Sequence, residues 1–283
     1  MPVDLPSQLL WPLAAFIGLC LGSFLNVVIT RLPVMLMREW RAEAREALEL
    51  ETETTPAFNM VTPRSLCPRC ETPIAWHDNL PVLGWLKRRG RCAHCHTRIS
   101  PQYPLVELAG ALLTLAVTAL FGPTLEGVFI LAACLSLLAM AVIDLRTQLL
   151  PDMLTLPLLW AGLLYQLLCQ PLQLPNAVIG AMAGYLSLWG FYWLFKAVTG
   201  KEGMGYGDFK LFAALGAWLG WIYLPLVLIL AAGAGAIVGV VVQLAVPRLR
   251  GAPMPFGPWL AAAGWMALLL GKPLMATYLT LVM

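Results

Sequence analysis

Long runs of apolar residues dominate the sequence, and one extended polar stretch interrupts them. A helix needs about 20 apolar residues to cross the hydrocarbon core of a bilayer. By that length, the sequence predicts spans near residues 8–29, 104–122, 125–143, 153–170, 176–198, 208–222, 224–246 and 256–275. The sixth is short, and Pro225 leaves open how it is joined to the seventh. We therefore predict an all-α polytopic membrane protein with about eight transmembrane helices.

The polar stretch divides the chain into three parts. We predict a first transmembrane helix within residues 1–30, a cytoplasmic insert over 31–103 and a membrane domain over 104–283. The insert holds 11 of the 18 lysines and arginines, and cytoplasmic loops of membrane proteins are rich in these residues. Alternating spans then put most of the others at cytoplasmic ends too: Arg146, Lys196, Lys201, Lys210, Arg248 and Arg250, with only Lys272 outside.

Composition supports the membrane assignment and limits the possible partners. The chain is 60% hydrophobic and 12% charged, against roughly 25% charged residues in a soluble domain. A formal net charge of +3 is too small to suggest a nucleic-acid-binding protein. The lipid bilayer is the partner that composition alone predicts.

Four cysteines in the insert have the spacing of a metal site. Cys67 and Cys70 form one Cys-x-x-Cys pair, and Cys92 and Cys95 form a second. Two such pairs predict a structural zinc site with four thiolate ligands, in a zinc-ribbon-like insert. The alternatives are disulfides or redox dithiols, which a reducing cytoplasmic location disfavours, and substitution of a ligand by one of the insert's histidines.

Carboxylates are the candidate catalytic groups of the membrane domain. No histidine follows residue 96, which excludes a Ser-His-Asp triad there. Asp144 ends the third predicted span and Asp208 begins the sixth, so both belong to the same side of the membrane. Ionisable residues in such positions often mark function. The alternative is that each merely caps a helix, as Asp208 could do at the start of its span.

Two aspartates that approach each other across a cavity share a proton, because both cannot ionise easily. An aspartic peptidase uses such a pair: one carboxylate accepts a proton from water while the other donates to the scissile carbonyl. The glycines at 203, 205 and 207 would let a substrate backbone approach Asp208 closely. The sequence therefore favours peptide hydrolysis.

Several motifs carry a family resemblance. They are GSFLNVVITRLP from residue 22, the two Cys-x-x-Cys pairs, QYPLVELAGALLT, IDLRTQLLPDMLTLPLLW, KEGMGYGDFKLFAALGAWLG and PFGPWLAAAG. In this order they resemble the type IV prepilin leader peptidase family, which also serves type II secretion. The resemblance implies a multi-pass protein of the bacterial inner membrane that removes the basic leader of prepilins and pseudopilins. It also implies methylation of the new amino terminus with S-adenosylmethionine.

The resemblance also assigns roles to residues. It makes Asp144 and Asp208 the catalytic pair, with Asp152, Glu202, Gly205 and Gly207 as supporting candidates. It associates Gly90 and Arg91 with methylation, although the family would have lysine where Arg91 stands. The alternative for Gly90 is that it only shapes the turn entering the second cysteine pair. No Gly-x-Gly-x-x-Gly motif marks a methyl-donor site.

Two other functions compete with the peptidase. A proton-coupled transporter could use the paired aspartates as a relay, but such proteins usually show repeated broken helices, and we find no repeat of the two motifs. A membrane-tethered zinc ribbon that only binds a partner would leave both aspartates without a role.

Overall fold

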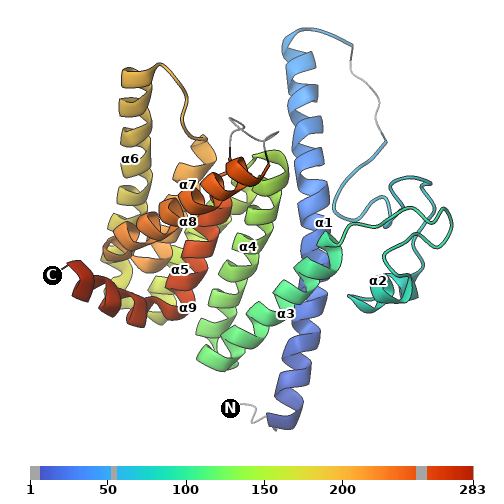
Figure 1. Cartoon of the computed structure of the whole chain (residues 1–283), viewed down its shortest axis with the longest axis horizontal. Helices are drawn as coiled ribbons and strands as arrows, with labels where there is room; N and C mark the ends of the chain where they lie inside the picture. The colour runs from blue at the N-terminus through green and yellow to red at the C-terminus, as the bar shows by residue number, and fades with distance from the viewer. Residues whose placement is uncertain (1–6, 52–55, 247–253, 283) are drawn as a thin grey trace. The chain divides into compact units, whose positions relative to one another are not determined.

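The computed structural model describes residues 7–51, 56–246 and 254–282, and the chain divides into two compact units, Met1–Ala119 and Leu120–Met283. Over the described residues the elements are helices, with two isolated β-bridges in the polar insert (Figure 1). The predicted all-α fold is thereby confirmed. Arg248 and Arg250, which were used to predict the topology, lie outside the described residues.

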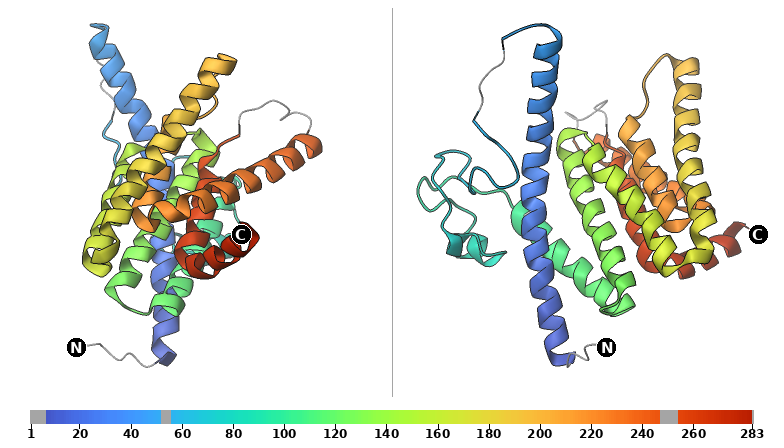
Figure 2. Two further views of the ribbon diagram at one scale, coloured as in Figure 1. Left: turned by 90° about the vertical axis from the view of Figure 1, so that its left-hand side faces the viewer. Right: turned by 180° about the vertical axis from the view of Figure 1, so that it is seen from behind.

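The first unit is built on one very long helix. Helix α1, Ser7–Ala47, has 41 residues, which corresponds to a length of about 60 Å. It continues straight through residue 31, where the polar stretch begins (Figure 2). Alternating charges at helical spacing support its water-exposed end. The helical start of the insert is therefore an extension of the membrane helix.

Helix α3, Gln102–Phe121, lies against the apolar half of α1. A Cβ built on Gly22 would come within 2.6 Å of the Cα of Glu107, so the two backbones are nearly in contact. Nearby, the buried Asn26 side chain donates a hydrogen bond to the carbonyl of Tyr103 (2.9 Å). Small residues and one interhelical hydrogen bond thus hold this pair together, as is common for helices in lipid.

The second unit contains the remaining long helices. They are α4 (Leu125–Thr147), α5 (Asp152–Cys169), α6 (Leu174–Thr199), α7 (Tyr206–Leu219), α8 (Leu224–Ala245) and α9 (Gly257–Val282). The turns Pro171–Gln173 and Trp221–Tyr223 join α5 to α6 and α7 to α8. Helix α7 packs against α5, α6 and α9, and most of its residues are buried.

Close backbone contact holds α6 against α7. Gly180 and Gly216 face each other so tightly that a Cβ on either would collide with the carbonyl oxygen of the other. A Cβ on Gly184 would likewise meet the carbonyl oxygen of Phe212 at 2.7 Å. Glycine is needed here because any side chain would push the helices apart.

Each of the eight predicted apolar segments is helical, but not all are long enough to span. Helix α7 has 14 residues, about 21 Å long, against a hydrocarbon core of about 30 Å. Helix α9 bends by 100° between Gly271 and Pro273. Among the described residues, six helices pass a length and hydropathy test, or seven if the bent helix counts as one span.

Candidate active site and metal centre

Asp144 lies in the last turn of α4 and is 5% exposed. The helix ends soon after it because Gln148 turns into the left-handed conformation (φ 54°) and donates its N–H to the Asp144 carbonyl (2.9 Å). The side chain is fixed as well. The backbone N–H of Gly257, the first residue of α9, donates to Oδ2 of Asp144 at 3.0 Å.

Asp208 lies in the first turn of α7 and is 7% exposed. Gly205 occupies the position before the helix, and no side chain caps it. The Asp208 N–H donates to the Gly205 carbonyl at 3.2 Å, but its side-chain Oδ1 is buried without a hydrogen-bond partner among the described residues. Asp208 is therefore not the N-cap residue of α7, a position that Gly205 occupies.

Leu150, in the link between α4 and α5, joins the surroundings of the two aspartates. A Cβ on Gly207 would lie 2.6 Å from the Cβ of Leu150, and one on Gly257 would lie 3.1 Å from its Cδ1. Asp144 and Asp208 are 64 positions apart in the sequence, and both are buried beside glycines that pack against the same leucine, Leu150.

Two of the supporting candidates lie outside this pair. The Glu202 side chain is 71% exposed and forms an ion pair with Lys196 (2.8 Å), which lowers the pKa of Glu202. The Asp152 side chain is 54% exposed and forms an ion pair with Lys210 (2.6 Å). Asp152 is the first residue of α5, after the N-cap Pro151, and no side chain caps this helix. Both carboxylates are therefore exposed groups that form ion pairs with lysines, unlike the two buried aspartates.

Sequence reasoning missed two residues of the site. Gly257 belongs to the PFGPWLAAAG motif, which carried the family resemblance but was given no role. Its contact with Asp144 joins positions 113 residues apart, a separation that no local pattern can reveal. Leu150 gave no signal, because a leucine in a membrane protein is unremarkable.

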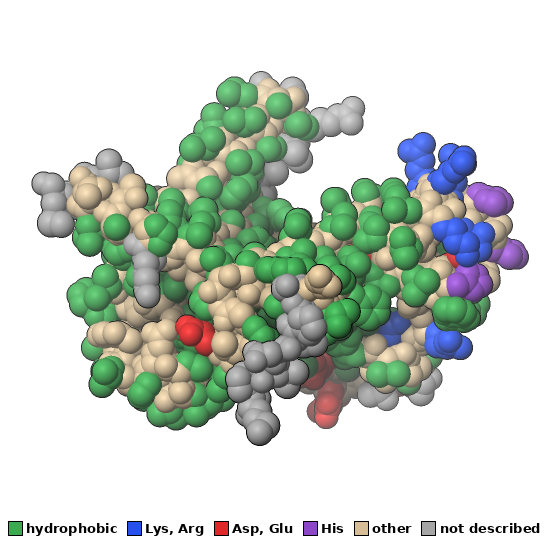
Figure 3. Space-filling view, turned by 90° about the horizontal axis from the view of Figure 1, so that it is seen from below, with side chains coloured by type: hydrophobic (Ala, Val, Ile, Leu, Met, Phe, Trp, Pro, Cys, Tyr) green, Lys and Arg blue, Asp and Glu red, His purple; other side chains and the backbone are tan. Residues whose placement is uncertain are grey.

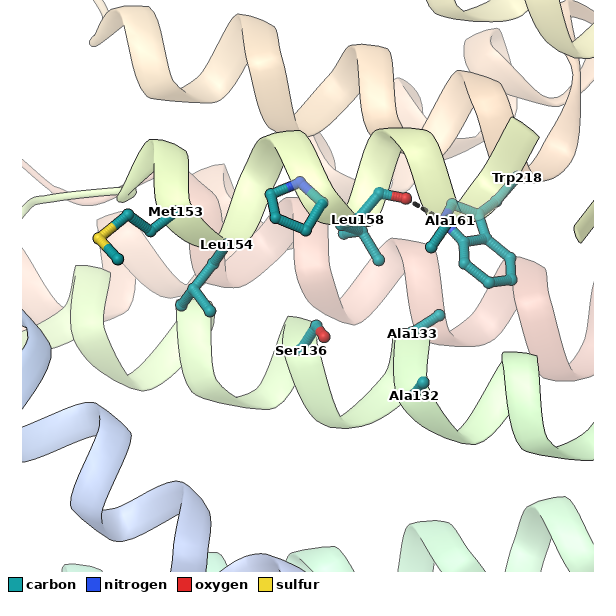
Figure 4. Close-up of a pocket in the computed structure, with 9 residues that line it drawn as sticks. Ala132, Ala133, Ser136, Met153, Leu154, Leu158, Ala161 and Trp218 are labelled. Carbon is teal, nitrogen blue, oxygen red and sulfur yellow. Dashed lines mark hydrogen bonds between the residues drawn. The ribbon is translucent and has the colours of Figure 1, made fainter. Parts of the chain in front are cut away.

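A small cavity of about 170 Å³ lies between α4 and α5 and ends at Trp218. Figure 4 shows its lining of Ala132, Ala133, Ser136, Met153, Leu154, Leu158 and Ala161, with the indole N–H of Trp218 donating to the Leu158 carbonyl. Neither aspartate of the pair lines it. It is an apolar gap between helices and is separate from the candidate active site.

The four cysteines of the insert come together as predicted. Their sulfur atoms all lie within 4.8 Å of one another, with Cys67 and Cys95 3.7 Å apart and Cys70 and Cys92 3.9 Å apart. A tetrahedral site with metal–sulfur bonds of about 2.3 Å places its sulfurs about 3.8 Å apart. A disulfide would need a separation of about 2 Å. The arrangement therefore fits a four-thiolate metal centre.

The two cysteine pairs are shaped by matching turns. In the first, the Cys67 N–H donates to the Thr72 carbonyl (3.0 Å), and in the second the Cys92 N–H donates to the Thr97 carbonyl (2.9 Å). The residues that follow each pair, Glu71 and His96, both have a φ of 54°. No histidine belongs to the metal cluster among the described residues.

Gly90 has a backbone conformation that explains why it is glycine. Its φ is +66°, in the left-handed region that other residues rarely adopt. A Cβ there would also lie 2.7 Å from the ring of Trp85. These observations fit the alternative in which Gly90 shapes the turn that enters the second cysteine pair. The side chain of Arg91, the next residue, is exposed.

Comparison with known proteins points in one direction. Residues 16–121 match the family described as the bacterial peptidase A24 N-terminal domain, and residues 131–240 match the type IV leader peptidase family. A protein of Aeromonas hydrophila is 53% identical over 274 residues, covering 96% of this chain and 94% of the relative. A Pseudomonas aeruginosa protein is 52% identical over 264 residues, covering 93% and 91%. Both are named prepilin leader peptidase/N-methyltransferase, and no solved structure matches the chain.

Proposed function

This chain belongs to the type IV leader peptidase family, and from that premise we propose that Asp144 and Asp208 are its catalytic pair. It is an enzyme, a membrane prepilin leader peptidase with N-methyltransferase activity, as its relatives' names state. The observation that supports the assignment is that two carboxylates, one from α4 and one from α7, are both buried beside glycines that pack against Leu150. Nothing found here favours a proton-coupled transporter.

The surroundings of the pair divide the two roles. The Gly257 N–H donates to Asp144, and such a donor stabilises a carboxylate more than a carboxylic acid. The carboxyl group of Asp208 also interacts with the backbone of Gly205, but its buried Oδ1 has no partner among the described residues, and we place the shared proton on that atom. In this mechanism Asp144 accepts a proton from the attacking water, while Asp208 donates its proton to the scissile carbonyl oxygen.

Mutation of each aspartate to asparagine tests this assignment. Asp144→Asn and Asp208→Asn keep the side-chain shape but remove the titrating proton, and we expect each to abolish leader removal. General acid–base catalysis contributes about 10²–10⁴-fold. Glu126→Gln is the control, because Glu126 lies in the first turn of the same helix α4 and bonds to Tyr165 (2.9 Å).

The assay uses purified protein, a prepilin and S-adenosylmethionine, and mass spectrometry reads both leader loss and the added methyl group. An aspartate whose asparagine variant cleaves as well as the Glu126→Gln control would not belong to the pair.

For the insert we propose a structural zinc ion held by Cys67, Cys70, Cys92 and Cys95. The sulfur separations support this, and a closed set of four thiolates leaves no open position for substrate. Zinc would contribute its binding energy to the folding of the insert. We also propose S-adenosylmethionine as the methyl donor, with Arg91 as the accessible member of the Gly90–Arg91 pair.

The substrates and orientation follow from the family and from charge. We propose that type IV prepilins and pseudopilins are cut, in the bacterial inner membrane, with the insert and the aspartate pair on the cytoplasmic side. The distribution of lysine and arginine supports this orientation. Cleavage on that side would suit a leader whose basic charge keeps it in the cytoplasm.

A further inference from the structure

The insert carries an exposed apolar edge that neither the metal centre nor the aspartate pair uses. We call it the α2 edge, after the short helix α2, Leu83–Lys87; it consists of Trp76, Leu80, Leu83 and Leu86. All four side chains are exposed, Trp76 by 75% and Leu83 by 65%. Leu83 and Leu86 are three positions apart on the helix and so share one side of it. Such a group of large apolar side chains marks an interaction surface.

One hydrogen bond sets the depth of this edge relative to the membrane helices. The N–H of Val82, directly before α2, donates to Oε2 of Glu107 at 2.7 Å. Glu107 is buried in α3, five residues after its first residue, Gln102, which is about 7.5 Å along the axis. Because helical side chains point back toward the N-terminus of their helix, Val82 lies beside the first turns of α3, whose 20 residues match the hydrocarbon thickness of about 30 Å. Val82 is therefore near the level where α3 enters the bilayer.

The figures show where α2 lies along the length of α1. In Figure 1, α2 is the part of the insert that reaches farthest toward the Ser7 end of α1. Figure 3 views the face that points in that direction, and basic and histidine side chains gather there over the insert, beside hydrophobic ones. The face of the insert that is turned toward the Ser7 end of α1 thus combines basic and apolar side chains.

Charge and continuity indicate what covers the edge. Lys87, Arg89 and Arg91 follow it and are exposed, and basic residues beside an apolar surface suit anionic lipid headgroups. On α3, Leu105 and Leu108 are also exposed, and they belong to a helix long and apolar enough to span the bilayer. The edge therefore extends the lipid-facing surface of the first unit.

We propose that the α2 edge inserts into the lipid leaflet on the insert's side, with its leucines among the upper acyl chains and the nearby basic side chains at the phosphates. The Val82–Glu107 hydrogen bond satisfies a backbone N–H that lipid could not satisfy. The insert is then an interfacial module that rests on anionic lipid. This proposal does not depend on the assignment of the catalytic aspartates.

A nitroxide label tests the depth in the full-length, zinc-loaded protein. The label is placed at Leu83 through a non-natural amino acid, which leaves the cysteines untouched, in nanodiscs of phosphatidylcholine and phosphatidylglycerol. The accessibility of the label is then measured separately with oxygen, which concentrates in lipid, and with a water-soluble nickel chelate. Leu112, exposed on α3, is the lipid control, and Glu43, on the polar end of α1, is the water control.

We expect the ratio of oxygen to nickel accessibility at Leu83 to exceed that at Glu43 several-fold and to approach that at Leu112. Omitting phosphatidylglycerol should lower the ratio. A label that is as accessible to nickel as the one at Glu43 would overturn the proposal. The proposal would also be overturned if the label at Leu83 became inaccessible to nickel only after prepilin is added, since the α2 edge would then be a protein-docking surface. Metal content is measured first, and if labelling Leu83 releases zinc, the label is moved to Leu86.

Discussion

Replacement of Gly257 by alanine probes how tightly the site holds Asp144. A Cβ on Gly257 would lie 2.6 Å from Oδ2 of Asp144, whereas ordinary contacts begin at 3.4 Å. Asp144 or the start of α9 must therefore move by about 0.8 Å. Because the neighbouring Leu150 side chain would also be 3.1 Å from the new methyl group, the carboxylate has little room on that side.

The expected loss follows from this displacement. A misplacement of about 1 Å in a catalytic group costs about 10²-fold in rate, which corresponds to about 2.7 kcal/mol in the activation barrier. We expect the loss to appear in kcat with little change in KM, because Asp144 acts on the transition state. The measurement is a time course of leader removal over a range of prepilin concentrations.

Gly264→Ala is the matched control. Gly264 lies on the same helix α9, and its Cβ would come equally close, 2.6 Å, to a methyl group of Leu215. Both variants therefore strain the packing of α9, but only one displaces an aspartate. If Gly257→Ala retains activity within twofold of Gly264→Ala, the claim that Gly257 positions Asp144 is wrong.

The insert offers three further tests. Cys67→Ser should release zinc and loosen the insert, because a structural metal contributes to folding; metal analysis decides this, and a wild-type protein without zinc would contradict the site. Arg91→Ala should leave cleavage intact and lower methylation, and full methylation by this variant would remove Arg91 from the methyl-transfer site. Gly90→Ala should instead lower zinc content, cleavage and methylation together, since the φ of +66° at Gly90 disfavours a side chain. Mass spectrometry of the product measures cleavage and methylation separately. The hydrogen bond from Arg88 lowers the pKa of Asp78 to about 2, so its stabilisation is complete above pH about 4, the ordinary value for aspartate, and is lost as the pH falls toward 2. Asp78→Asn should therefore speed hydrogen exchange in α2 at pH 7, and unchanged exchange would show that this contact does not hold the helix.

Much of the fold could be predicted because its signals are local. Apolar runs of sufficient length must be helical in lipid, where every backbone polar group needs an internal partner, and each predicted segment is indeed a helix. The cluster of four cysteines could also be predicted from the sequence, because two tight turns with fixed spacing bring four sulfurs together. Local patterns could not fix lengths, however. Helix α1 continues to Ala47, well past residue 30, where the change from apolar to polar residues predicted the end of the first span.

For the candidate site, the sequence alone selected Asp144 and Asp208 as candidates, since carboxylates are rare and costly in an apolar chain. Only the tertiary structure separated them from the exposed carboxylates of Asp152 and Glu202, which pair with lysines. Only the structure could show that α9 returns Gly257 to Asp144, or that Glu107 binds the backbone of the insert. These contacts join residues 113 and 25 positions apart. They depend on how helices pack against one another, and no local sequence pattern encodes that packing.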